Sequence, residues 1–317
     1  MTIGPEAAVP QAAPPRGLPT VKTLAELANV PVGPDASSAV AVRRALAAPA
    51  LRLIEHDEGV RAGEDPEAIH QARVATRRLR ANLGTLRPLL DEERVEELRA
   101  ELSWLGRALG DVRDLDVLLV RFRARAQRLE ARDAHAAKRL LAGLAESRAG
   151  AHASLLEEWR SPRHDRLLVA CERAVRAVPD REELAVDAFG PLMERPWRRL
   201  RRACERLGPE SPASGLHAAR IAAKRARYAA EAFAPMYGDR AATFLRRAAA
   251  LQDVLGEHQD AVAAQAWLRG KVARSTPSVA FVAGELAAEE ARARAAARRA
   301  WPAAWRALAK PKARFWA

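Results

Sequence analysis

The feature that most constrains the fold of this 317-residue chain is an internal repeat. Residues 69–80 read IHQARVATRRLR and residues 216–227 read LHAARIAAKRAR, an offset of 147. A second pair follows at an offset of 146, LGRALGDVRDLD at 105–116 and LQDVLGEHQDAV at 251–262. Because similar segments recur in the same order, the sequence predicts two similar halves.

The repeated segments have the pattern of long helices. Apolar residues follow Asp65-Pro66-Glu67 at spacings of three and four, which predicts a helix from Pro66 to Leu90 with a kink or break at Pro88. Asp91 predicts the next helix start. No alternating β pattern is evident, and the Ala- and Leu-rich composition favours helix. We therefore predict an all-α fold, a tandem pseudo-twofold repeat of two four-helix bundles.

Prolines mark the organisation of the chain. Residues 1–35 hold seven of the 20 prolines, which predicts a flexible arm, with 20–30 as a possible short docking helix. The helical halves are expected at about 36–178 and 179–317, divided at Pro179.

Composition narrows the function classes. The net charge of +13 and sequence pI of about 10.8 predict an acidic partner. Cys171 and Cys204 are the only cysteines, which excludes a disulfide framework and a Cys-rich zinc module. No apolar run is long enough for a membrane span, and the N-terminus lacks the pattern of a secretory signal, so we expect a cytoplasmic protein.

The first repeated segment carries a basic face. His70, Arg73, Arg77 and Arg80 fall within about 80° of one helix face, and the equivalent positions of the second half do the same. No acid interrupts either segment, so these cations lack a local partner, and the arginine fork matches phosphate oxygens. The sequence thus predicts a polyanion site, with a solvated basic face as the simpler alternative.

The histidines of this face predict a dependence on pH. His70 and His217 occupy equivalent places beside arginine, where they would contact or orient phosphate, although a histidine can also serve a helix by bonding a backbone carbonyl. Neighbouring arginines disfavour the charged imidazole and bound phosphate favours it. Binding is therefore expected to strengthen as the pH falls below neutrality.

These residues and motifs resemble the CHAD family, and the resemblance extends from about residue 36 to the C-terminus. It implies two four-helix bundles with a basic central groove or pore, binding of inorganic polyphosphate and recruitment to polyphosphate granules. Members are often fused to an N-terminal CYTH domain, whose Glu-x-Glu-x-Lys signature is absent from this sequence, so its catalysis is not carried over. The implied polyphosphate contacts are His70, Arg73, Arg77, Arg78, Arg80, His217, Arg220, Lys224, Arg225 and Arg227, with Arg198, Arg199 and Arg202 added on charge placement alone.

Two other functions remain open at this stage. The same basic faces suit non-specific nucleic-acid binding, where Trp197 is a candidate for stacking on a base. A metal-assisted enzyme acting on polyphosphate would need carboxylates such as Asp111, Asp114 and Asp116, which are more simply helix-start acids. We expect a non-enzymatic polyphosphate-binding protein with no catalytic residue, metal or cofactor.

Overall fold

The computed structural model describes residues 21–63, 65–208, 210–273 and 275–316, and it confirms the all-α prediction. The protein is 86% helical, and the described segments contain no strand. One isolated antiparallel bridge joins Ser37 to Leu184. The Ser38 amide donates to the Glu183 carbonyl at 2.7 Å, and the Ala185 amide donates to the Ala36 carbonyl at 2.9 Å.

Several helices in the first part of the chain begin with a side-chain cap. The Asp65 carboxylate accepts from the Glu67 amide, the Asp91 carboxylate from the Arg94 amide, and the Ser161 hydroxyl from the His164 amide. The helices are α1 (Val21–Asn29), α2 (Ser38–Glu55), α3 (Asp57–Ala62), α4 (Pro66–Leu86), α5 (Glu92–Ala126), α6 (Ala134–Trp159) and α7 (Pro162–Arg176), with 3₁₀ turns at Arg87–Leu89 and Ala131–Asp133.

The second part repeats the order of α2, α4, α5 and α6. Its helices are α8 (Ala185–Glu205), α9 (Ala213–Tyr237), α10 (Asp239–Val272) and α11 (Pro277–Leu308), followed by a 3₁₀ turn at Pro311–Ala313. Helices α8, α9 and α10 each begin 147 residues after α2, α4 and α5. A third echo appears here, because Pro49 inside α2 and Pro196 inside α8 are also 147 residues apart.

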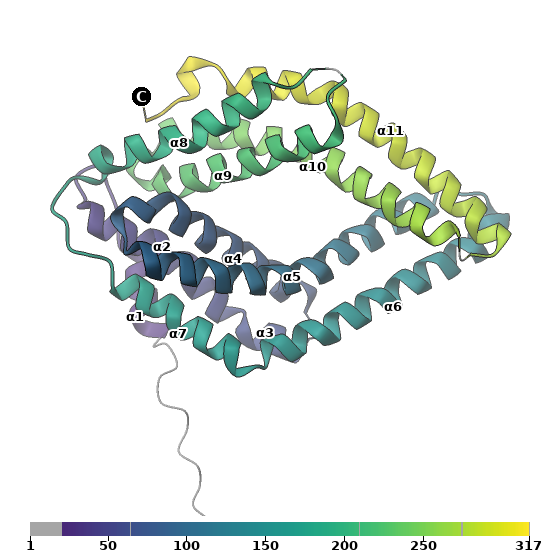
Figure 1. Ribbon diagram of the computed structural model, residues 1–317, viewed down its shortest axis with the longest axis horizontal. Coiled ribbons are helices and arrows are strands. Elements are labelled where there is room, and N and C mark those ends of the chain that lie inside the picture. The colour runs from purple at the N-terminus through teal and green to yellow at the C-terminus, as the bar shows by residue number, and fades with distance from the viewer. Residues whose placement is uncertain (1–20, 64, 209, 274, 317) are drawn as a thin grey trace, which may run out of the picture.

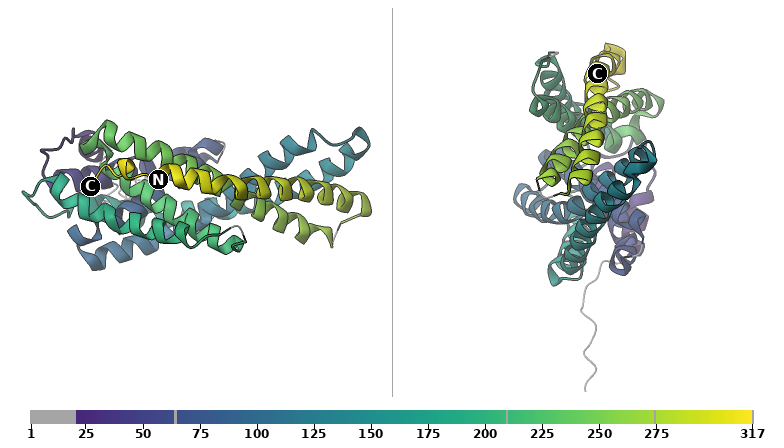
Figure 2. Two further views of the ribbon diagram at one scale, coloured as in Figure 1. Left: turned by 90° about the horizontal axis from the view of Figure 1, so that it is seen from above. Right: turned by 90° about the vertical axis from the view of Figure 1, so that its right-hand side faces the viewer.

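The two parts meet in the middle of the molecule and again at one end. Helices α4 and α9 contact each other, and the hairpins α5–α6 and α10–α11 leave this region in the same direction (Figures 1 and 2). At the far end the hairpins pack together through a separate apolar cluster, in which Phe122 and Leu144 from one hairpin join Leu268 and Leu286 from the other.

The main core lies around α2, α4, α8 and α9 and is closed by the C-terminal tail. Phe315 and Trp316 turn back onto α8 and α10, where the Trp316 ring lies 5.9 Å from the Trp197 ring and 5.3 Å from the Phe244 ring, centroid to centroid. Trp197 is only 3% exposed, so it belongs to this core and is not available for stacking on a base.

One local prediction is confirmed, and one helix ends earlier than expected. Residues 1–20 of the expected flexible arm lie outside the described residues. The short docking helix expected within 20–30 is confirmed as α1, which packs against α2 with Leu24 and Ala28 buried. The expected Pro66–Leu90 helix is α-helical only to Leu86, and the following turn is 3₁₀. Pro88 has no amide hydrogen to continue the α-helical ladder.

None of the described helices combines the length and the apolar character needed to cross a membrane.

Candidate anion-binding site

Four cations from the two repeated helices gather where α4 meets α9. Arg73 and Arg77 come from α4, Arg220 and Lys224 come from α9, and we call these four residues the central quartet. They are two equivalent pairs, since 73 maps to 220 and 77 to 224. The positive charge of Arg220 acts on Arg73, and the charges of Arg73, Arg77 and Arg220 all act on Lys224. The fold therefore joins the two predicted basic faces into one cluster.

The second repeated segment explains how the quartet is held in place. In the first half, Arg73 Nη2 lies 3.2 Å from Asp114 Oδ1, and in the second half Arg220 Nη2 lies 3.9 Å from Asp260 Oδ1. Both aspartates belong to the echoed segments of α5 and α10. Each half thus uses its second motif to position the arginine of its first motif.

Gly110 of α5 leaves room for the Arg73 side chain. A Cβ atom at this position would lie 2.7 Å from Arg73 Nη1, closer than van der Waals contact allows. The equivalent Gly256 of α10 faces Arg220, where a Cβ atom would lie 3.9 Å from Nε. The glycine in each second motif therefore allows an arginine to lie close to the neighbouring helix, and only at Gly110 would a Cβ atom force the arginine side chain to shift.

Burial and mutual repulsion shift the ionisation of the quartet. Burial first, and then the charges of Arg220, Arg77 and Arg73, lower the pKa of Lys224 to about 7. Burial is also the main cause that lowers the pKa of Arg73, with Asp114 opposing it. The Nε atoms of Arg73, Arg77 and Arg220 are buried with no hydrogen-bond partner among the described residues. A bound anion would relieve the repulsion between these crowded positive charges.

The two histidines lie beside the quartet in unequal surroundings. His217 Nδ1 is 2.8 Å from Gln259 Oε1, whereas the buried Nδ1 of His70 has no partner among the described residues. Burial, followed by the charge of Arg113, lowers the pKa of His70. The direction agrees with the sequence-based expectation that arginine neighbours disfavour the charged imidazole.

A second basic group continues from the quartet along one side. Arg80 of α4 lies near Arg77 and near Arg225 of α9, and Arg225 in turn lies near Arg199 of α8. Burial, then the charges of Arg99, Arg225, Arg107 and Arg77, lower the pKa of Arg80. We call Arg80, Arg225 and Arg199 the open flank.

Sequence reasoning missed the cations that α5 adds to this surface. Arg99 and Arg107 act on Arg80, and Arg113 acts on both His70 and Arg73. Their spacing along α5 is eight and six residues, which is compatible with one broad helix face but is too loose a signal to identify alone. Only the packing of α5 against α4 reveals their role.

Four of the predicted contacts are placed differently from the others. Arg78 and Arg227 are both paired with Glu231. Because Glu231 lies four residues after Arg227 on the same helix, the expectation that these cations lack a local partner is wrong for Arg227. Arg198 is exposed and lies 3.8 Å from Glu194, and Arg202 is exposed with no contact to the quartet recorded within the described segments. The structure therefore brings together the two histidines, the quartet, Arg80, Arg225 and Arg199, and separates the remaining four.

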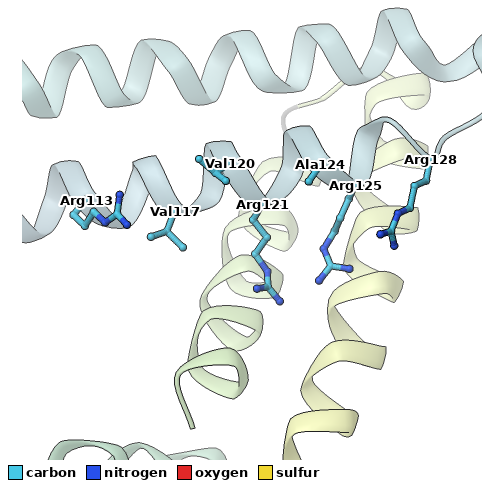
Figure 3. A pocket seen from close by; sticks show the side chains of 7 residues that line it. All are labelled: Arg113, Val117, Val120, Arg121, Ala124, Arg125 and Arg128. Carbon is cyan, nitrogen blue, oxygen red and sulfur yellow. The ribbon is translucent and has the colours of Figure 1, made fainter. Parts of the chain in front are cut away.

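A cavity of about 520 Å³ extends the surface along α5 beyond Arg113. Figure 3 shows Arg121 and Arg125 extending from α5 toward the neighbouring hairpin. Their guanidinium groups are occupied, since Arg121 Nη2 lies 2.7 Å from Glu257 Oε1 and 2.6 Å from Glu290 Oε2, and Arg125 Nε lies 2.6 Å from Glu290 Oε1. This network joins the two hairpins rather than offering free cations.

Two of the three carboxylates considered as metal ligands form ion pairs with arginines instead. Asp114 pairs with Arg73, and Asp116 Oδ1 lies 3.0 Å from Arg148 Nε. Asp111 is exposed. Across the segments that the structure describes, no group of three His, Cys, Asp or Glu side chains has a geometry suited to a metal ion.

The comparisons with known proteins agree with this architecture. The chain belongs to the CHAD domain family, whose model matches residues 44–269. It is 30% identical over 246 residues to an uncharacterized protein of Mycobacterium tuberculosis, an alignment that covers 75% of this chain. The chain spans about half the length of the curated relatives it matches, since the alignment covers 46% of that protein.

Solved structures show the same fold. The CHAD domain from the plant Ricinus communis superposes with a TM-score of 0.73 at 28% identity, covering 88% of this chain and 95% of the plant domain. PptA from Streptomyces chartreusis superposes with a TM-score of 0.70 at 23% identity, covering 86% of this chain and all of that one.

Proposed function

We propose that this protein binds inorganic polyphosphate, without turning it over, along the central quartet and the open flank. The observation that carries the proposal is the gathering of the central quartet from both halves at the α4–α9 contact, where the four positive charges act on one another. Phosphate oxygens would accept from the guanidinium and ammonium groups of the quartet and offset the crowded charge, and arginine suits such bidentate contacts.

A linear polyanion fits this surface better than a single phosphate. The cations extend from the quartet through Arg77 to Arg80, Arg225 and Arg199, and so involve α4, α8 and α9. A chain of phosphates would contact several of these residues at once. The cations of the protein would then release the counterions condensed on the chain. Long chains are therefore expected to bind more tightly than short ones, and affinity is expected to fall steeply with salt.

Nucleic acid is the second candidate for the same cations. Binding of single strands commonly adds aromatic stacking to the electrostatic attraction. Trp197, the aromatic residue that the sequence places among these arginines, is buried in the core. This burial argues against binding of a single strand by stacking on Trp197, and duplex DNA is separated from polyphosphate by the titration below.

Binding without turnover is supported by the state of the nearby carboxylates. Asp114 and Asp260 are paired with the quartet arginines, and Asp116 is paired with Arg148. Phosphate release in the presence of Mg²⁺ or Mn²⁺ that is lost in Asp114→Ala would overturn this part of the proposal.

A competition titration tests the binding itself. Fluorescent long-chain polyphosphate is displaced by unlabelled polyphosphate or duplex DNA in one buffer at ~0.15 M salt. The double variant Arg73→Ala/Arg220→Ala loses two charge-assisted contacts of at least ~1.5 kcal/mol each, so its affinity should fall by roughly a hundredfold. Lys138→Ala/Arg139→Ala removes two exposed charges from α6 and is the control for charge alone.

The outcomes separate the candidates. Preference for polyphosphate over DNA by more than a hundredfold, together with loss in the quartet variant and little change in the α6 control, supports the proposal. Equal competition by DNA, or equal loss in both double variants, would show that the charge acts as a diffuse surface. Recruitment to polyphosphate granules is part of the proposal, and a fluorescent fusion should leave the granules when the quartet is mutated.

A further inference from the structure

One carboxylate of α9 holds arginines from both halves. Glu231 Oε2 accepts from Arg78 Nε of α4 at 3.1 Å, and Glu231 Oε1 accepts from Arg227 Nε of its own helix at 2.8 Å. Arg78 and Glu231 line a cavity of about 270 Å³, where Arg44 and Arg52 of α2 are also present. An anion bridged by two arginine groups therefore occupies one side of the α4–α9 contact.

The internal repeat identifies the equivalent place on the other side. The offset of 147 maps Arg78 to Arg225, Arg80 to Arg227 and Arg52 to Arg199. The open flank is thus the same set of arginines, assembled from the same helices with the halves exchanged. The position that corresponds to Glu231 is Gly84. The arginines are repeated, but the carboxylate that pairs with two of them is not.

The open flank shows the consequences of the missing carboxylate. Arg80 Nη1 donates to the Ser103 hydroxyl at 3.1 Å, and neither Arg80 nor Arg225 has a carboxylate partner among the described residues. Their positive charges repel, and Arg107 and Arg99 add to that repulsion. Arg99 carries a partner of its own, with Nη1 2.7 Å from Glu96 Oε1.

We propose that Arg80, Arg225 and Arg199 form a discrete subsite for one phosphoryl group, and that Glu231 fills the pseudo-equivalent subsite with the protein's own carboxylate. This inference rests on the proposed function and refines it. A polyphosphate chain would then leave the quartet along one flank only, although the cationic framework is twofold. Glu231 acts as a specificity-determining residue that closes the other flank to anions.

Gly84 provides a direct test, because the missing carboxylate can be supplied. A Cβ atom built at Gly84 would lie 3.4 Å from Arg99 Cζ, an ordinary contact with the end of a flexible side chain. Gly84 lies within α4, where a glutamate has better helix propensity than glycine. Gly84→Glu would place a carboxylate as Glu231 is placed relative to Arg227, and Gly84→Gln has nearly the same shape without the charge.

Affinity for long-chain polyphosphate is measured for wild type, Gly84→Glu, Gly84→Gln and Glu231→Gln, with thermal melting of each. The inference expects Gly84→Glu to bind at least tenfold more weakly than Gly84→Gln, and Glu231→Gln to bind at least threefold more tightly than wild type. Equal affinity of the two Gly84 variants would overturn it.

A matched pair of double variants gives an independent test that does not depend on Gly84. Arg80→Ala/Arg225→Ala removes the open subsite, and Arg78→Ala/Arg227→Ala removes its pseudo-equivalent. The first should weaken polyphosphate binding at least tenfold and the second less than threefold, and equal losses would contradict the inference.

These outcomes are distinct from failure of the proposed function. If wild type binds polyphosphate and Arg73→Ala/Arg220→Ala does not, while the two Gly84 variants bind equally and the two flank double variants bind equally, the subsite is wrong and the proposed function stands. Failure of wild type to bind would instead refute the proposed function.

Discussion

Lys224 should make polyphosphate binding depend on pH above neutrality. In the free protein, burial and the charges of Arg220, Arg77 and Arg73 lower the pKa of this lysine to about 7, while Asp260 of α10 opposes the shift. Lys224 is therefore about half charged at pH 7 and only about 1% charged at pH 9. Bound phosphate stabilises the charged form, so binding takes up a proton in this range.

The expected magnitude follows from proton linkage. If the bound anion returns the pKa of Lys224 to about 10, near the ordinary lysine value, the observed affinity should be roughly 50-fold weaker at pH 9 than at pH 7. The sign is fixed, because raising the pH removes the charge from the free protein and leaves a cost for restoring it on binding. Fluorescence titration at constant ionic strength, between pH 7 and pH 9, measures the effect.

Lys224→Arg is the matched control for this prediction. Arginine keeps its charge throughout the range, so the affinity of this variant should change less than about threefold between pH 7 and pH 9. All histidines remain in the variant, so any contribution from them persists in it. Affinity of the wild type that is independent of pH, or a pH dependence that survives in Lys224→Arg, would refute the reasoning.

Three further predictions concern stability and ligand size. Glu290→Gln removes the buried charged partner of Arg121 and Arg125 and should lower the free energy of unfolding in urea by about 3–5 kcal/mol. Glu289 is more exposed, so Glu289→Gln should lower it by less than about 1 kcal/mol, and equal losses would contradict the burial of the Glu290 pair. Burial lowers the pKa of His164 to about 4, so the protein should lose up to roughly 3 kcal/mol of stability as the pH falls from 6.5 toward 4. His164→Phe should remove most of that pH dependence, and an unchanged slope would show that other groups cause it. Triphosphate should bind at least tenfold more weakly than long-chain polyphosphate at equal phosphate concentration, and equal affinities would exclude an extended site.

The pseudo-twofold repeat explains both the number of cations at the candidate site and their asymmetric surroundings. A repeated arginine motif doubles the number of cations at the α4–α9 contact without lengthening any helix. The repeat is not exact. Glu231 supplies a carboxylate to the arginines of one flank, whereas Gly84 at the equivalent position supplies none to the other. One carboxylate therefore pairs with the arginines of one flank and leaves those of the other without such a partner among the described residues.

The sequence by itself determined the fold class and the repetition of a basic helix face. Helical periodicity, caps such as Asp65 and Asp91, and the doubled motif specify long helices and repeated basic faces, because these signals act over a few residues along the chain. They also led to phosphate as the predicted ligand type, since no acid lies within either segment and arginine suits phosphate oxygens.

Only the tertiary structure decided which of those cations act together. Arg77 and Arg78 are neighbours in sequence, yet one joins the quartet and the other pairs with Glu231, because adjacent residues on a helix point about 100° apart and α2, α5 and α9 lie in different directions. Partners 41 to 153 residues apart, such as Asp114 for Arg73 and Glu231 for Arg78, leave no periodic signal in the chain. Charge placement along a helix is a local property, whereas neutralisation of that charge depends on which helices pack against it.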